Sequence, residues 1–117
     1  MYGLIGKLRA TAGNRDRLAA VLLRSTTAMP GCLSYIVATD ASEPDALWVT
    51  EVWSSAEAHR ASLAAPEVRQ AISEARPILA GFGERFETRP IGGAVRLRSR
   101  GGGHSRLGPD PQMERQR

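Results

Sequence analysis

Residues 46–59, Ala-Leu-Trp-Val-Thr-Glu-Val-Trp-Ser-Ser-Ala-Glu-Ala-His, decide the fold because they join a strand to a helix. The first half is rich in aromatic and β-branched residues, which favour a half-buried strand over residues 47–53. Ser54 and Glu57 have the spacing of a capping box, in which the serine hydroxyl accepts from the Glu57 N–H. This stretch therefore predicts a strand that turns into a helix at Ser54, with Trp53 at the corner.

Side chains on this predicted strand point alternately to the two faces of a sheet. One face carries Trp48, Thr50 and Val52, and the other carries Leu47, Val49, Glu51 and Trp53. His59 follows in the second turn of the helix, so the corner is suited to holding Glu51, Trp53 and His59 at a cavity mouth. If the Glu51 face is buried, the cost of a lone carboxylate predicts an arginine partner, within the chain or across a dimer.

The other elements follow from the same kinds of pattern. They are a strand over residues 2–10, a helix begun by Asn14 or Asp16 and ended at 29–31, a strand over 32–39, a helical piece over 54–64, a helix from Pro66 that Pro77 kinks or ends, and a strand over 84–90. Gly81 and Gly83 are predicted to break the last helix. The order β-α-β-β-α-β predicts an α+β fold, the ferredoxin-like sandwich.

The predicted sandwich has helices on one face of its sheet only, which leaves the other face partly apolar. Packing that face against a second copy buries it, so we expect a homodimer. Residues 1–91 are expected to form one domain, and residues 92–117, rich in glycine, arginine and proline, a disordered basic tail. The net charge of +4 lies in this tail, and a solvated tail binds polyanions non-specifically, so no specific nucleic-acid partner is expected.

Cysteine and histidine usage argues against disulfide and metal sites. Cys32 is alone, so the chain has no intrachain disulfide, and His59 and His104 are too far apart in sequence to form a recognisable metal-ligand cluster. No apolar run approaches the roughly 18 to 20 residues of a membrane span. The N-terminus also lacks the pattern of a signal peptide. We therefore expect a cytoplasmic protein with no membrane partner.

Several stretches of the body together resemble one family. They are residues 30–35 (Pro-Gly-Cys-Leu-Ser-Tyr), the acidic loop with Pro44, residues 51–53 (Glu-Val-Trp) and residues 55–59 (Ser-Ala-Glu-Ala-His). Over residues 1–91 the chain resembles the antibiotic biosynthesis monooxygenase family, especially its small bacterial quinol monooxygenases. The resemblance implies a dimeric α+β barrel in which each subunit keeps a pocket between its own sheet and helices. It also implies oxidation of phenols, anthrones or quinols by O2 without flavin, haem or metal.

Such a reaction needs a dry apolar pocket, a proton acceptor and donors for a developing oxyanion. The matching catalytic groups are Trp53, whose indole N–H donates while its ring stacks, and His59, whose imidazole can take up a proton near neutral pH. Trp53, Glu51 and Arg76 are expected to bind the small aromatic substrate, with an arginine such as Arg60 or Arg76 stabilising its anion. No cofactor is expected, because the deprotonated substrate reduces O2 itself.

Two other functions remain open: a non-oxidative isomerase of a small oxygenated metabolite with His59 as base, and a non-enzymatic dimeric ligand-binding protein. Trp53 also fits plain core packing, and His59 fits a half-exposed helical histidine bonded to a carboxylate. Related polyketide oxidisers often bring an asparagine to the pocket, and the haem-degrading branch has one on its first strand. The only asparagine here, Asn14, falls in a turn, which disfavours haem degradation and leaves anthrone-type catalysis in question.

Overall fold

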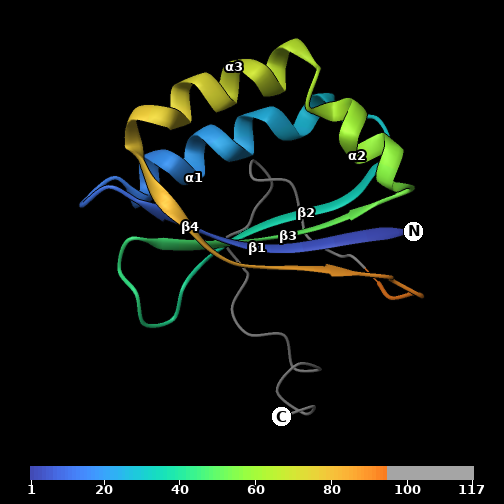
Figure 1. Ribbon diagram of the computed structural model, residues 1–117, viewed down its shortest axis with the longest axis horizontal. Coiled ribbons are helices and arrows are strands. Elements are labelled where there is room, and N and C mark those ends of the chain that lie inside the picture. Colours follow the sequence, from blue (N-terminus) through green and yellow to red (C-terminus); the bar gives the residue numbers. More distant parts are fainter. Residues whose placement is uncertain (95–117) are drawn as a thin grey trace, which may run out of the picture.

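The computed structural model describes residues 1–94, arranged as a sheet with helices on one side (Figure 1). The elements are β1 (Tyr2–Ala10), α1 (Arg15–Arg24), the 3₁₀ helix η1 (Ser25–Ala28), β2 (Cys32–Thr39), β3 (Ala46–Trp53), α2 (Ala56–Ser62), α3 (Pro66–Ala75), the 3₁₀ helix η2 (Arg76–Ile78) and β4 (Leu79–Thr88). The predicted tail lies outside the described residues from position 95 onward.

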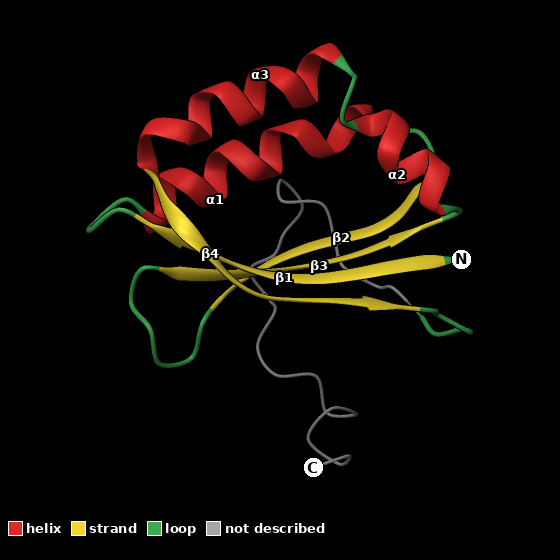
Figure 2. Ribbon diagram, in the orientation of Figure 1, coloured by secondary structure: helices red, strands yellow, loops and turns green. Residues whose placement is uncertain are grey.

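The four strands form one antiparallel sheet in the order β2-β3-β1-β4. Figure 2 shows α1, α2 and α3 together on one face of this sheet, and residues 1–94 place no helix on the other face. This arrangement confirms the predicted ferredoxin-like α+β fold. No helix within residues 1–94 is long and apolar enough to cross a membrane.

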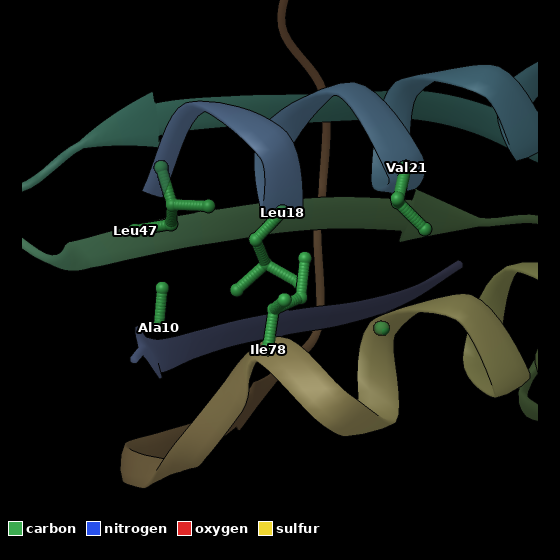
Figure 3. Packing of buried hydrophobic residues seen from close by; sticks show 6 residues of the cluster. Ala10, Leu18, Val21, Leu47 and Ile78 are labelled. Atoms are coloured by element: carbon green, nitrogen blue, oxygen red, sulfur yellow. The ribbon is translucent and has the colours of Figure 1, made fainter. Parts of the chain in front are cut away.

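The core lies between α1, α3 and the helix-facing side of the sheet (Figure 3). Leu18 of α1 is completely buried, and Leu47 of β3 is 1% exposed. The buried cluster consists of Ala10, Leu18, Val21, Leu47, Ala75 and Ile78. Leu47, Val49 and Trp53 are all buried, so the face of β3 that also carries Glu51 lies against the helices, which the sequence left open.

The end of α3 differs from the prediction. Pro77 ends the helix, as expected, because the helix stops at Ala75 and a 3₁₀ turn follows. Gly81 and Gly83, however, lie inside β4 rather than between helix and strand, so the prediction that they break the helix was wrong. Close contact between strands explains one of them, because a Cβ at Gly83 would lie only 3.0 Å from Cδ of Lys7.

The start of α2 also differs, by one residue. Ser55, not Ser54, is the N-cap, and its hydroxyl accepts from the backbone N–H of Ala58 at 3.0 Å. The Ser54 N–H instead donates to the carbonyl of Gly31 at 2.8 Å, which keeps Ser54 in the turn. Gly31 has φ +85°, and a Cβ there would lie 2.7 Å from the Ala58 Cβ, so this corner requires glycine.

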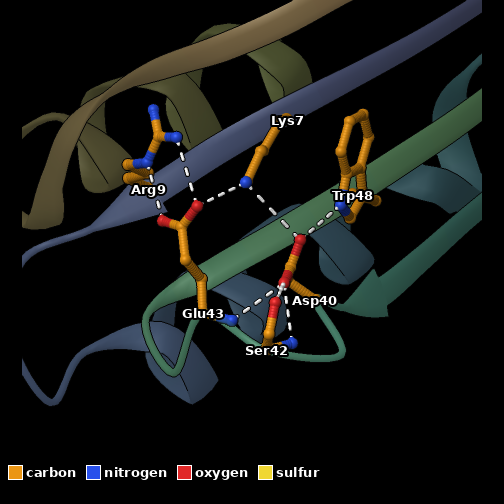
Figure 4. Close-up of polar contacts among 6 residues, drawn as sticks. All are labelled: Lys7, Arg9, Asp40, Ser42, Glu43 and Trp48. Atoms are coloured by element: carbon orange, nitrogen blue, oxygen red, sulfur yellow. Dashed lines mark hydrogen bonds and ion pairs between the residues drawn. The ribbon is translucent and has the colours of Figure 1, made fainter.

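The open face of the sheet carries an ion-pair cluster built on a buried lysine (Figure 4). Lys7, 8% exposed, pairs with Glu43, lies 3.5 Å from Asp40, and sits 5.6 Å from the centroid of the Trp48 ring. Asp40 accepts from two backbone N–H groups, at 2.8 Å each, and from the Trp48 indole at 2.7 Å; these donors hold the pKa of Asp40 well below its usual range. The Arg9 guanidinium and then Lys7 lower the pKa of Glu43 to about 2. The buried ammonium is therefore paired, which offsets the cost of its desolvation.

Candidate functional site

A cavity of about 540 Å³ opens between the helix-facing side of the sheet and the helices. Its wall is largely apolar, with side chains from α1, α3, β1 and β4. The polar side chains on the wall include Tyr35, Glu51, Trp53, His59 and Arg76. A cavity of this size and character is typical of sites for small organic ligands.

The structure brings Glu51, Trp53 and His59 together, as the sequence predicts. The Trp53 indole Nε1–H donates to Oε1 of Glu51 at 2.8 Å, and the same oxygen lies 3.9 Å from Nε2 of His59. The Trp53 and His59 rings stand edge to face with centroids 5.3 Å apart. Trp53 is 1% exposed, and the side chains of His59 and Glu51 are 19% and 17% exposed. We call these three residues the Glu51–His59–Trp53 cluster.

The predicted arginine partner of Glu51 is not found within residues 1–94. Its carboxylate accepts instead from the Trp53 indole, two residues along the same strand. This hydrogen bond gives the carboxylate the partner that the prediction expected an arginine to supply. The physical reason is local, because both side chains project from the same face of β3 and the indole N–H reaches back along the strand. An arginine from a second subunit stays a prediction.

Arg76 lies in η2 and lines the same cavity. Within residues 1–94, no ion pair or hydrogen bond joins it to the Glu51–His59–Trp53 cluster, so its part in substrate binding stays a prediction. Both arginines are exposed, but Arg60, on α2, is not on the cavity wall. The structure therefore favours Arg76 over Arg60 as the cation near a bound molecule.

Two tyrosines lie near the Glu51–His59–Trp53 cluster, and only Tyr35 lines the cavity; neither was singled out from the sequence as functional. Tyr2 pairs with Trp53 in the β1–β3 register, and its ring centroid is 5.7 Å from that of His59. Tyr35 pairs with Glu51 in the β2–β3 register and lines the cavity. Burial raises the pKa of the Tyr35 phenol, which therefore stays a neutral hydrogen-bond donor. Only knowledge of the strand pairing would have revealed either residue.

The arrangement is suited to moving a proton at the edge of an apolar cavity. An imidazole sits between two aromatic rings, with a carboxylate near its Nε2, and that carboxylate is oriented by an indole N–H. An imidazole with a carboxylate beside it is a common arrangement for a general base. Burial raises the pKa of the Cys32 thiol, which disfavours a thiolate nucleophile. Residues 1–94 contain no group of three or more side chains placed to hold a metal ion.

Comparison with known proteins places the chain among relatives of the same fold. A family model described as antibiotic biosynthesis monooxygenase matches residues 1–74. The chain is similar to a "putative antibiotic biosynthesis monooxygenase" from Chloroflexus aurantiacus, with 55% sequence identity and a TM-score of 0.78 over 80% of this chain and 96% of that one. A search of curated proteins gave no match.

Two further solved structures with the same description have the same fold. The protein from Deinococcus radiodurans shares 28% identity with a TM-score of 0.65, over 84% of this chain and 99% of that one. The protein from Caulobacter crescentus shares 19% identity with a TM-score of 0.70, over 78% and 90%, a likeness that shows the fold alone. The family model spans more than half of the chain, including the whole Glu51–His59–Trp53 cluster. The chain therefore belongs to the antibiotic biosynthesis monooxygenase family.

Proposed function

We propose that the protein is a monooxygenase that uses O2 to oxidise a quinol, a polycyclic phenol or an anthrone, with the substrate itself as the source of electrons. The observation that carries the proposal is the Glu51–His59–Trp53 cluster on the wall of a largely apolar cavity of about 540 Å³. Membership of a monooxygenase family supports the reaction class. The substrate class comes from the family resemblance, and the largely apolar cavity wall supports an aromatic molecule.

In this proposal His59 takes a proton from the bound substrate, and Glu51 stabilises the imidazolium that forms. Trp53 is a positioning residue for the Glu51 carboxylate, and its ring packs edge to face with the imidazole. Tyr35, which stays protonated, donates to the developing oxyanion, and Arg76 balances its charge from the cavity wall. Exclusion of water by the apolar wall strengthens each of these interactions.

The substrate anion then transfers electrons to O2. In the overall reaction of an anthrone, the reacting CH2 becomes a carbonyl, one oxygen atom enters the product, and the other leaves as water with the two hydrogens. The substrate loses four electrons, which is the number that O2 takes up. The reaction therefore balances without another reductant, which is why we propose that no flavin, haem or metal takes part.

The decisive test is oxygen consumption with a menadiol-type quinol and with an anthrone, after subtraction of autoxidation. We expect uptake that is proportional to protein concentration. Uptake equal to autoxidation for both compounds would overturn the proposal. Product formation under strict anaerobiosis would instead support a non-oxidative isomerase, and tight binding of an aromatic ligand without turnover would support a ligand-binding protein.

We also propose that two copies pack through the open faces of their sheets. The strand registers place Phe86, Ile5, Thr50 and Ile36 in one row across this face, and Phe86 is 52% exposed. The three apolar side chains of this row lose contact with water when a second sheet covers them. Light scattering at micromolar concentration should give twice the chain mass of 12.6 kDa. A mass of one chain would contradict the dimer.

A further inference from the structure

A second cavity adjoins the first along the helix-facing side of the sheet. It has a volume of about 290 Å³ and lies over the middle of β1. Both cavities are lined by Leu8, Leu22, Tyr35, Glu51 and Phe82. The second cavity therefore begins at the carboxylate of the Glu51–His59–Trp53 cluster and extends away from His59.

Gly6 lies on the wall of this second cavity, in the interior of β1. In register it sits between Val49 of β3 and Arg85 of β4, and Leu4 and Leu8 flank it on the same face. A glycine inside a strand is destabilising by roughly 0.5 to 1 kcal/mol relative to alanine, because it loses more conformational freedom on folding. Its presence at this position therefore needs a reason.

Neither backbone conformation nor packing supplies that reason. Among the described residues, positive φ is confined to Gly13, Gly31 and Gly93, so Gly6 has a backbone that other residues adopt. A Cβ at Gly6 would meet no atom within 4 Å. Gly3 in the same strand is different, because a Cβ there would lie 2.1 Å from Oγ1 of Thr88. The space above Gly6 is thus free of protein atoms and belongs to the cavity.

We propose that Gly6 is a specificity-determining residue, whose missing side chain admits the far rings of a fused-ring aromatic substrate. The inference rests on the proposed function and narrows its substrate to compounds of two or three fused rings. One ring lies at Glu51 and His59, and the others lie flat over Gly6, between Leu4, Leu8 and Val49. Arg85, on the wall beside Gly6, offers a guanidinium to an oxygen substituent or ring face at the far end.

Gly6→Val tests the proposal, and Gly81→Val is its matched control. Gly81 is also a strand glycine without positive φ, and a Cβ there also meets nothing within 4 Å, but it lines neither cavity. Binding is measured by calorimetry with two probes that need no turnover: anthraquinone-2-sulfonate, with three rings, and 4-methoxyphenol, with one. Thermal melts accompany both variants, and valine, which favours strands, should not lower the melting temperature.

We expect the ratio of the three-ring Kd to the one-ring Kd to rise at least tenfold in Gly6→Val and to stay within twofold of wild type in Gly81→Val. An unchanged ratio in Gly6→Val, an equal rise in Gly81→Val, or a wild-type protein that binds neither probe would overturn the proposal. Binding is measured without O2, so the two proposals can fail separately. If the Kd ratio rises as expected but no oxygen uptake is found, the proposed oxidation is wrong and the role of Gly6 in binding is retained.

Discussion

His59→Ala should lower kcat/KM for the O2-dependent oxidation of a quinol by about 10²- to 10⁴-fold, the usual contribution of a positioned general base. In the proposed mechanism the imidazole accepts the substrate proton, and Glu51, 3.9 Å from its Nε2, stabilises the resulting charge. Its removal leaves the cavity wall otherwise intact. Oxygen-electrode assays over a range of substrate concentrations measure the change.

The matched control for this variant is Glu57→Gln, on the exposed side of the same helix, which should retain wild-type kcat/KM. Trp53→Phe keeps an aromatic ring, removes the N–H that orients Glu51 and leaves part of the buried indole space empty, but it keeps the base, so its loss should be smaller than that of His59→Ala. Thermal melts close to wild type are required for all three variants. Wild-type kcat/KM in His59→Ala would show that the imidazole is not the base.

Leu18→Ala should lower the free energy of unfolding by about 2 to 5 kcal/mol, the range for truncation of a buried leucine. The Leu18 side chain, on the sheet-facing side of α1, is completely buried, and it packs in a cluster with Val21, Leu47 and Ile78. Truncation removes its apolar burial and leaves a cavity that rigid strands on one side cannot collapse to fill. Urea denaturation followed by circular dichroism measures the change.

The control for the core is Leu18→Met, a volume-conserving change that should cost less than about 1.5 kcal/mol. All proteins must be compared at one concentration, because the stability of the proposed dimer would depend on protein concentration. A loss below about 1 kcal/mol in Leu18→Ala would mean that the core rearranges to fill the space.

The local patterns of the sequence predict most of the elements. Residues 32–39 were predicted as a strand and form β2. Pro66 is the first residue of α3, and Pro77 lies two residues after its last residue, Ala75. The errors fall where two local signals compete. Both Ser54 and Ser55 are good N-caps, and the hydrogen bond of Ser54 to Gly31, a distant residue, decides between them.

In the candidate site, too, some residues were predicted from local sequence and others were found only in the tertiary structure. Glu51 and Trp53 share a face because side chains alternate on a strand, and His59 follows them at a fixed distance along the next helix. Tyr2 and Tyr35 were found only through the pairing of β3 with β1 and β2, which joins residues distant in sequence. The indole partner of Glu51 was also missed, because a predicted face does not give side-chain directions.

The sequence by itself determined the order of the elements, the division of the β3 side chains between two faces and the corner that holds Trp53, since these depend on residues within a few positions of one another. Only the tertiary structure decided the strand registers, the partner of Glu51 and the place of Gly6 on a cavity wall. The physical reason is that register is set by the packing free energy of the whole sheet against α1 and α3. That free energy is a property of contacts between distant residues, so no single stretch of sequence contains it.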